Sequence, residues 1–314
     1  MLDGQIVFGC ARLKGGAYER NSARLIEYCL RAGIRHFDTA PSYGMGTAEN
    51  VVGNVVSGLR DVFLSAKVGS VRPNHAILRT YASALKRLML ERPKRSGPTS
   101  APQSRGAFIH QHRFDYSPVA IRESLDRTRG RLRRERLDYL FLHEVPSVEL
   151  IRSAVEVLEQ EKRRGAAVEI GYANGRCFDR GLDAMLPSGF VPQFAARPCD
   201  LQLDGPGLSK PHFLHSIASA GFALQKSDAA FGDKISRIAV PLATSARLDL
   251  AAVEIAVFFT VLHAGFPSAK LIFASTSQER TRAFVEALAL IENSIGIAAV
   301  LRALSLLEES AGES

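Results

Sequence analysis

The sequence predicts an α/β protein folded as a single (β/α)8 TIM barrel with parallel strands. Short apolar runs alternate with amphipathic helical segments, and near-continuous apolar strands are typical of a parallel sheet covered by helices. About eight such strands fit within 314 residues, which favours a closed barrel over two open sheets. The first strand is followed by residues 12–15 (RLKG) and lacks the pattern G-x-G-x-x-G, so a doubly wound dinucleotide fold loses its main support.

The first third of the chain shows the strand and helix signals most clearly. Strands are predicted at residues 5–10, 34–40 and 62–67. Asn21 can cap a helix whose apolar face carries Leu25, Ile26, Cys29 and Leu30. Gly33 ends that helix in the C′ position, where the left-handed backbone favours glycine. A second helix is predicted over roughly 46–58.

The regular pattern breaks at residues 91–107, which hold three prolines, two glycines and several serines. This composition predicts a mobile surface loop, which together with the following residues 108–113 covers 91–113. The strand–helix pattern resumes afterwards, so we expect one barrel domain over residues 1–314.

A helix is predicted to start at Ser117, with Ser117 as N-cap and Pro118 at the first helical position. One stripe at helical spacing then carries Ile121, Leu125, Thr128 and Leu132. The arginine-rich segment 127–136 (RTRGRLRRER) is interpreted as a solvated helix face and its turn, with a nucleic-acid patch as the less favoured reading.

The second half is predicted from weaker signals. Strands are expected at residues 137–142, 167–171, 190–195, 222–225 and 269–273. Helices are expected from Ser147 to about 164, from about 247 to 264, and from 277 onward, with a last helix and polar tail at the C-terminus.

Composition places the chain among ordinary globular proteins, with 46% hydrophobic and 23% charged residues. The net charge of +8 is not gathered into a basic run interleaved with aromatic residues, so neither nucleic acid nor membrane is expected as a partner. The four cysteines show no C-x-x-C spacing, and the N-terminus does not resemble a signal peptide. The longest apolar run, residues 251–262, is too short to span a bilayer. A cytoplasmic location is therefore expected.

Four ionisable residues fall at or just after the C-terminal ends of predicted strands, where barrels of this type carry their reactive groups: Asp38, Tyr43, Lys67 and His143. A tyrosine hydroxyl is a reluctant proton donor, and a nearby lysine ammonium favours its phenolate. An aspartate can hold the lysine charged, and a histidine can orient a carbonyl oxygen. The set suits proton transfer to an oxyanion, and it contains no serine or cysteine nucleophile for covalent hydrolysis.

These residues lie in segments that resemble the aldo-keto reductase family. Residues 33–53 (GIRHFDTAPSYGMGTAENVVG) resemble its signature, and residues 65–69 (SAKVG) look like the segment that bears the family lysine. Residues 114–143 are similar to the helix and strand that lead to the family histidine, most of all in the branch of sugar and pyridoxal dehydrogenases. The resemblance extends over residues 5–175 and is weak afterwards.

The resemblance implies an NAD(P)-dependent oxidoreductase that transfers a hydride between nicotinamide and an aldehyde, ketone or alcohol. Tyr43 would be the general acid or base, Lys67 and Asp38 would tune it, and His143 would orient the substrate. A small-molecule carbonyl or alcohol is the expected partner, and the substrate, reaction direction and oligomeric state are left open.

The cofactor half matches the family less well. Asn174 follows an alanine where the family often has serine, and Gln193 is aligned with the glutamine of the sixth strand. Lys226 and Ser227 stand as substitutes for the pyrophosphate loop after the seventh strand. After the eighth strand, the residues expected to meet phosphates are Ser275, Thr276, Ser277 and Arg280. Arg280 favours NADP(H) over NAD(H).

Two alternatives follow from the sequence. Because the C-terminal half matches the family's cofactor-binding residues less well, the sequence is also compatible with a catalytically weak or inactive binding or regulatory protein of the same family. The histidine pairs His110/His112 and His212/His215 lack a carboxylate or cysteine at supporting spacing, so no metal site is predicted.

Overall fold

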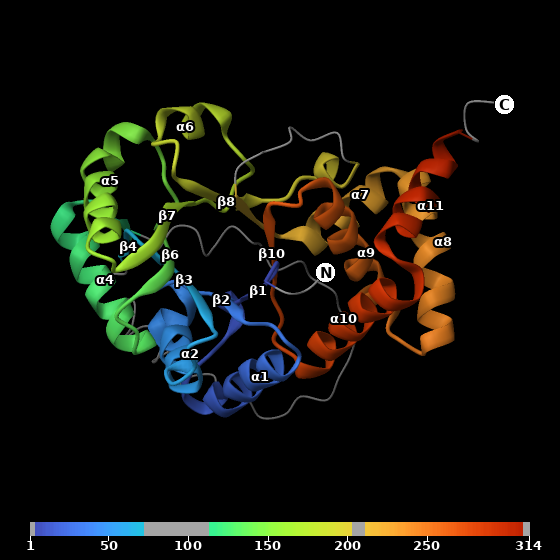
Figure 1. Cartoon of the computed structure of the whole chain (residues 1–314), viewed down its shortest axis with the longest axis horizontal. Helices are drawn as coiled ribbons and strands as arrows, with labels where there is room; N and C mark the ends of the chain where they lie inside the picture. The colour runs from blue at the N-terminus through green and yellow to red at the C-terminus, as the bar shows by residue number, and fades with distance from the viewer. Residues whose placement is uncertain (1–3, 72–112, 203–210, 310–314) are drawn as a thin grey trace, which may run out of the picture.

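The strands of the main sheet are all parallel and close into a barrel in the order β1-β10-β9-β8-β7-β6-β3-β2 (Figure 1). The computed structural model describes residues 4–71, 113–202 and 211–309. The barrel strands are β1 (Ile6–Gly9), β2 (His36–Asp38), β3 (Phe63–Val68), β6 (Leu137–His143), β7 (Ala167–Ala173), β8 (Val191–Ala195), β9 (His212–His215) and β10 (Ala269–Phe273). The predicted (β/α)8 barrel is therefore confirmed.

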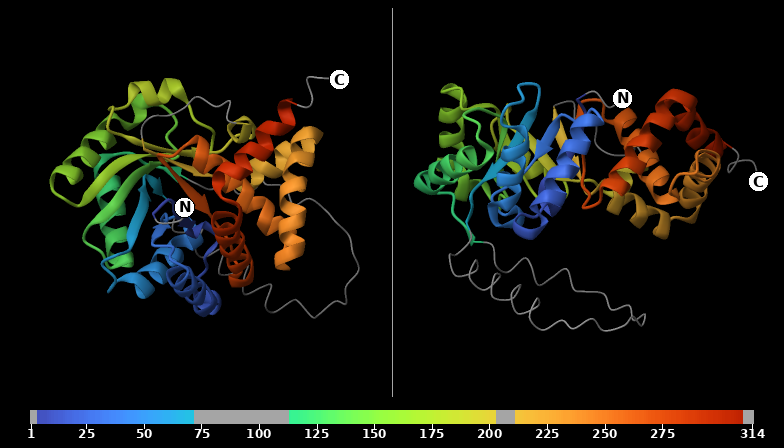
Figure 2. Two further views of the ribbon diagram at one scale, coloured as in Figure 1. Left: turned by 45° about the vertical axis from the view of Figure 1, so that its right-hand side comes forward. Right: turned by 90° about the horizontal axis from the view of Figure 1, so that it is seen from below.

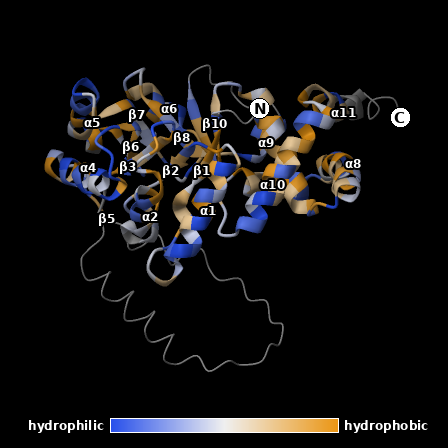
Figure 3. Ribbon diagram, turned by 60° about the horizontal axis from the view of Figure 1, so that its bottom comes forward, coloured by the Kyte–Doolittle hydropathy of each residue, from blue (hydrophilic) through white to orange (hydrophobic). Residues whose placement is uncertain are grey.

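Helices cover the outside of the barrel, and Figure 3 shows hydrophobic residues concentrated in the strands that the helices enclose. In the first two thirds of the chain these are α1 (Glu19–Arg31), α2 (Thr47–Val56), α4 (Pro118–Leu132), α5 (Val148–Arg163) and α6 (Arg180–Met185). The last third contributes α7 (Ile217–Ser227), α8 (Ala229–Ala246), α9 (Leu250–Gly265), α10 (Gln278–Leu290) and α11 (Ile297–Glu309).

The predicted helix ends can be compared with the capping geometry. Gly33 has φ +86° and its N–H donates to the Leu30 carbonyl, so the C-terminus of α1 is closed as predicted. At α4, Ser117 Oγ accepts from the Ala120 N–H and Pro118 occupies the first turn, as predicted. The N-terminus of α1 differs, because the helix begins at Glu19, two residues before the predicted cap Asn21.

The barrel interior is filled by side chains and is not a pore. A cluster of six buried residues, one from each of six strands, packs across the axis: Val7, Phe141, Ala173, Val191, Phe213 and Ile272. The rings of Phe141 and Phe213 meet edge to face with centroids 5.3 Å apart. Strand side chains alternate in direction, so the residues two positions further along point inward at the C-terminal rim. These are His143 after Phe141 and His215 after Phe213.

The predicted strand at 222–225 is wrong. The seventh barrel strand is β9 (His212–His215), and residues 222–225 lie inside α7. The strand has only four residues with a histidine at each end, so its sequence shows no alternation of apolar and polar residues. Phe222 and Leu224, two residues apart, show such an alternation although they lie in a helix. For the same reason the sequence predicts no helix at the position of α8.

The C-terminal helices form a second layer beside the barrel (Figure 2, right). Between β9 and β10 the chain makes three helices, α7, α8 and α9, where a regular barrel unit has one. Nine of the sixteen residues of α9 are buried. This helix packs against α8, α10 and α11, which explains why its sequence is apolar on every side.

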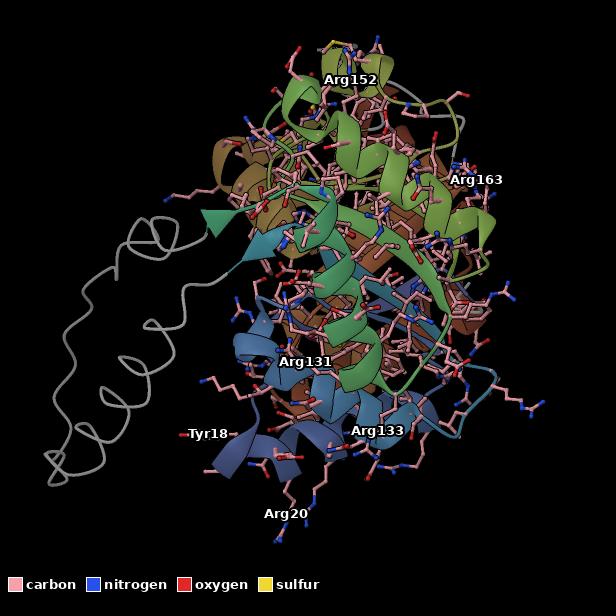
Figure 4. The ribbon with its side chains drawn as sticks, turned by 90° about the vertical axis from the view of Figure 1, so that its left-hand side faces the viewer. Tyr18, Arg20, Arg131, Arg133, Arg152 and Arg163 are labelled. Atoms are coloured by element: carbon pink, nitrogen blue, oxygen red, sulfur yellow. The ribbon has the colours of Figure 1, made fainter. Side chains whose placement is uncertain are left out.

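The arginine-rich segment 127–136 forms the end of α4 and the turn after it. Arg131 Nη1 pairs with the buried Glu49 of α2 at 2.9 Å, and Arg127 pairs with Glu123 one turn back. Arg134 donates to the main-chain oxygens of Val56 and Leu59. In Figure 4, Arg131 and Arg133 are labelled at the end of α4, and Arg152 and Arg163 are labelled on the neighbouring α5. The interpretation as a helix face and its turn is confirmed.

Beside the barrel, β4 (Ser70–Val71) and β5 (Arg113–Phe114) form a short antiparallel pair. The predicted loop at 91–113 lies outside the described residues except for its last residue. Within the described segments, no helix taken singly is both long and apolar enough to cross a membrane, and only the bent pair α10–α11 passes on length and composition.

Candidate active site

Asp38, Lys67 and His143 lie on neighbouring strands and meet at the C-terminal rim of the barrel. Asp38 ends β2, Lys67 is the last but one residue of β3, and His143 ends β6. Because β2, β3 and β6 are adjacent and parallel, their final residues come to the same edge. Tyr43 begins the short helix η3 (Tyr43–Gly46), which follows β2.

Asp38 and Lys67 form a buried ion pair. Lys67 Nζ lies 2.7 Å from Asp38 Oδ1 and 2.6 Å from Oδ2, and their side chains are 2% and 3% exposed. Lys67 Nζ also donates to the Thr39 main-chain oxygen at 3.3 Å. Charges taken out of water this completely are retained only with good geometry and hydrogen bonds, and this pair has both.

The ammonium of Lys67 stands beside the ring of Tyr43, with Nζ 5.0 Å from the ring centroid. On the other side, the ring of His143 meets Tyr43 at 89°, with centroids 6.3 Å apart. The structure therefore brings all four predicted residues together, with Tyr43 between a cation and an imidazole.

Burial and charge compete in setting the pKa values of this group. Burial disfavours the charge on Lys67, but Asp38 and Tyr43 outweigh it and the pKa of Lys67 is raised. Burial also raises the pKa of Tyr43, while Lys67 lowers it by a smaller amount. The lysine acts in the predicted direction, but burial exceeds its effect, so Tyr43 is a phenol at neutral pH.

The loop that carries Tyr43 is fixed by short contacts. Gly44 and Gly46 have φ values of +54° and +82°, which glycine adopts without steric cost. Thr47 Oγ1 donates to the Gly44 oxygen at 2.6 Å and accepts from the Gly15 N–H at 3.1 Å. A side chain on Gly44 or Gly15 would collide with Thr47. These contacts tie the loop after β2 to the loop after β1.

The main chain at His143 is held just as firmly. The hydroxyl of Tyr116 donates to the main-chain oxygens of His143 at 2.7 Å and of Glu144 at 2.8 Å. Glu144 has φ +56°, and its carboxylate accepts from the Gly175 N–H at 2.9 Å. The loops after β6 and β7 are thereby joined next to His143.

Asn174 and Gln193 come from the next two strands round the rim, Asn174 directly after β7 and Gln193 on β8. Gln193 is 3% exposed on β8 and its Nε2 donates to Asp38 Oδ2 at 3.4 Å. Its Oε1 is buried and meets no hydrogen-bond partner among the described residues. Asn174 Oδ1 accepts from the Val145 N–H at 2.7 Å, and its Nδ2 donates to the Val145 oxygen at 3.3 Å. Among the described residues, the second amide hydrogen of Asn174 meets no acceptor.

The polar residues predicted after the eighth strand gather at the N-terminus of α10. Ser277 caps this helix and accepts from the Arg280 N–H. Ser275 Oγ accepts from the Ser277 N–H and donates to its oxygen, both at 3.1 Å. The exposed Arg280 donates from Nη2 to Thr276 Oγ1 at 2.9 Å. Main-chain N–H groups and a guanidinium at a helix N-terminus suit a phosphate.

Lys226 and Ser227 do not belong to the site. They end α7, which leads away from the rim, because β9 finishes eleven residues earlier at His215. The segment that follows the seventh strand is Ser216-Ile217-Ala218. The proposed substitutes for the pyrophosphate loop are therefore withdrawn.

His215 also lies at the rim, although the sequence analysis does not predict it as a site residue. It ends β9, Nε2 lies 2.9 Å from the Asn174 main-chain oxygen, and Nδ1 lies 2.9 Å from Ser216 Oγ. His212 stacks on Phe194 outside the barrel lining, so the two histidines of β9 face different sides. Groups of three His, Cys, Asp or Glu that could hold a metal are absent from the described residues, and His110 and His112 fall outside them.

Comparison with known proteins agrees with this geometry. Residues 5–177 match the model of the aldo/keto reductase family, which is more than half of the chain. D-threo-aldose 1-dehydrogenase of Pseudomonas sp. is 29% identical over 158 residues, which are 48% of this chain and 43% of that protein. Pyridoxal 4-dehydrogenase of Microbacterium luteolum is 30% identical over 139 residues, which are 43% of this chain and 38% of that protein. The match thus spans less than half the length of either relative.

Solved structures share the fold. The holo form of an aldo-keto reductase from Bacillus halodurans has a TM-score of 0.62 at 18% identity and covers 96% of this chain and 91% of its own. Glycerol dehydrogenase from Gluconobacter oxydans gives 0.63 at 15%, covering 96% and 91%. An aldo-keto reductase from Klebsiella pneumoniae in complex with NADPH gives 0.60 at 20%, covering 95% and 90%. Family model, curated relatives and barrel agree, and the chain belongs to the aldo/keto reductase family.

Proposed function

We propose that this protein is an NAD(P)-dependent oxidoreductase that interconverts an aldehyde or ketone and its alcohol. The observation that carries the proposal is the buried Asp38–Lys67 pair, whose ammonium lies 5.0 Å from the ring centroid of Tyr43. Such an arrangement is costly in a protein that only binds ligands, because both charges are removed from water. It is useful where a proton must be delivered to a developing oxyanion.

In the reductive direction Tyr43 donates its proton to the carbonyl oxygen. It can do so at neutral pH because its raised pKa keeps it protonated. Lys67 then stabilises the phenolate that remains, and Asp38 holds Lys67 charged and in place. The ring of His143 on the other side of Tyr43 orients the carbonyl. A bound nicotinamide would supply the hydride, and in oxidation the Tyr43 phenolate would take up the proton of the alcohol.

The residues around the rim fit such a cofactor. Gln193 Oε1 is a buried acceptor without a partner in the described structure, and Asn174 keeps one free amide hydrogen, so together they complement a carboxamide. The Ser275–Ser277 run and Arg280 complement phosphate at the N-terminus of α10. Arg280 would meet a 2′-phosphate, which favours NADP(H) over NAD(H).

Steady-state assays test the proposal directly. Wild-type protein is mixed with NADPH or NADH and a panel of aldehydes that starts from pyridoxal, and with NADP⁺ or NAD⁺ and aldoses, the substrate classes named for the two relatives. Tyr43→Phe removes only the hydroxyl, so we expect kcat to fall about 100-fold to 10,000-fold. The dissociation constant for NADPH, measured by fluorescence, should stay the same.

The same assays separate the alternative function. If wild-type protein binds NADPH tightly but turns over no faster than Tyr43→Phe, the proposed reaction is wrong and a binding or regulatory role is favoured. If no nicotinamide cofactor binds, the barrel has lost the chemistry altogether.

A further inference from the structure

The barrel order places β9 between two groups of proposed cofactor residues. Gln193 is on β8, and the Ser275–Arg280 cluster follows β10. In the barrel, β9 is the strand that separates β8 from β10. A cofactor that reaches from the carboxamide site at Gln193 to the phosphate site at Arg280 therefore has to cross the end of β9. The last residue of that strand is His215.

The side chain of His215 faces the barrel axis. Phe213, two residues earlier, belongs to the interior cluster, and side chains two apart on a strand share a face. In the ladder between β8 and β9, Gln193 is paired with Phe213 and Ala195 with His215. His215 thus lies one step above Gln193 toward the mouth of the barrel, on the path just described.

Hydrogen bonds define the protonation state of the ring. The Asn174 main-chain oxygen can only accept, so Nε2 carries a hydrogen and donates to it at 2.9 Å. Nδ1 lies 2.9 Å from Ser216 Oγ, whose hydroxyl can donate to a neutral ring or accept from a protonated one. Adding a proton to His215 therefore breaks neither contact. It changes the charge of the site by one unit and leaves the geometry in place.

The groups that face this ring come from β2, β3 and the loops after β6 and β7. Burial lowers the pKa of His215 and Lys67 of β3 lowers it further, whereas the Asn174 carbonyl, Asp38 of β2 and Glu144 after β6 raise it. The balance leaves the pKa below its usual value. His215 is therefore neutral at neutral pH and gains its charge only at a lower pH than an ordinary imidazole does.

We propose that His215 makes the site distinguish the two redox states of the cofactor as a function of pH. The oxidised nicotinamide ring carries a positive charge and the reduced ring is neutral. Protonated His215, beside the crossing path, repels the charge that only the oxidised ring carries. Its attraction for the phosphates is common to both forms and cancels in the ratio of their dissociation constants. The inference rests on the proposed function, because it requires that a nicotinamide cofactor binds at this rim.

Paired binding titrations test the inference without turnover. Dissociation constants for NADP⁺ and for NADPH are measured by calorimetry at intervals from pH 8 down to the lowest pH at which circular dichroism shows the protein still folded. Both forms share the 2′-phosphate, so its own titration cancels in the ratio of the two constants. We expect the ratio of the NADP⁺ constant to the NADPH constant to rise as pH falls. The rise is limited to about tenfold per pH unit, because one proton is linked to binding.

His215→Gln keeps an N–H donor but cannot be protonated, and it should make the ratio independent of pH. His143→Gln is the matched control, since it removes the other rim imidazole and should leave the pH dependence in place. A flat ratio in the wild type, with both forms bound, overturns the inference and leaves the proposed function standing. A pH dependence that survives in His215→Gln but disappears in His143→Gln also overturns it. If neither NADP(H) nor NAD(H) binds at any pH, the inference and the proposed function are overturned together.

Discussion

At the rim of the barrel, Lys67 keeps its charge with a side chain that is only 2% exposed. Asp38 makes this possible because both of its carboxylate oxygens accept from Lys67 Nζ. The charge of Lys67 in turn acts on Tyr43, whose ring lies beside it. Removing Asp38 alone would leave a buried cation without its partner, which is strongly destabilising. Asp38 therefore acts on Tyr43 through Lys67.

The pKa of Tyr43 sets the pH dependence of the proposed reaction. Burial raises it above its ordinary value of about 10, against the opposing effect of Lys67. Reduction needs the phenol, so kcat/KM for the carbonyl at saturating NADPH should stay level through pH 8 to 10 and fall only above that range. Oxidation needs the phenolate, so its rate should rise with pH over the same interval, by up to tenfold per unit.

Both profiles are measured with the wild type and one substrate pair. His215 titrates on the acid side, since its pKa is lowered, and does not disturb this range. A reduction profile that already falls between pH 7 and 9 would contradict the raised pKa of Tyr43.

At the scale of single elements, Gly171 shows how closely the strands approach. It is paired with Val191 across β7 and β8, and a Cβ placed on it would lie 1.9 Å from the Val191 main-chain oxygen. Backbone cannot move aside as a flexible side chain can. Gly171→Ala should therefore lower the free energy of unfolding by roughly 1–3 kcal/mol.

Gly130 in α4 provides the matched control. A Cβ there meets open space, and alanine is favoured in a helix. Gly130→Ala should raise the free energy of unfolding by about 0.5–1 kcal/mol. Urea denaturation measures both variants, and equal effects would mean that the close approach at Gly171 has no energetic consequence.

At the scale of the whole molecule, α9 connects the barrel to the C-terminal helices. Phe259 of α9 meets Phe284 of α10 with centroids 4.9 Å apart and Phe273 of β10 at 6.3 Å. The rings of Phe273 and Phe284 are themselves stacked at 4.0 Å. Because these contacts join strand and helices, barrel and helical layer should unfold in one cooperative transition.

Phe259→Ala tests this coupling. The loss of a buried ring should lower the free energy of unfolding by about 3–5 kcal/mol while the single transition is kept. Phe222→Ala, at a ring that is 38% exposed, should cost much less. Unfolding is followed by circular dichroism and by calorimetry, and two separate transitions in the wild type would show that α9 does not couple the layers.

Much of this protein is determined by local sequence. Asp38, Lys67 and His143 lie at the ends of strands with a clear apolar pattern, and Tyr43 follows soon after one. Parallel strands bring their ends together in any closed barrel. The helix ends at Gly33 and Ser117 are likewise local, because capping depends on residues within one turn. The sequence could therefore name these positions without knowing their distances.

Other features depend on contacts between distant segments. The strand β9 is defined by its neighbours β8 and β10, since four residues carry too weak a pattern of their own. The position of its end residue His215 at the rim depends on the closed barrel. So do the hydrogen bonds between the Asn174 side chain and the Val145 main chain, which occupy part of the amide that the sequence assigned to the cofactor. The direction of the pKa shift of Tyr43 also depends on the tertiary structure. Burial raises this pKa by more than Lys67 lowers it, and only the folded chain buries the ring.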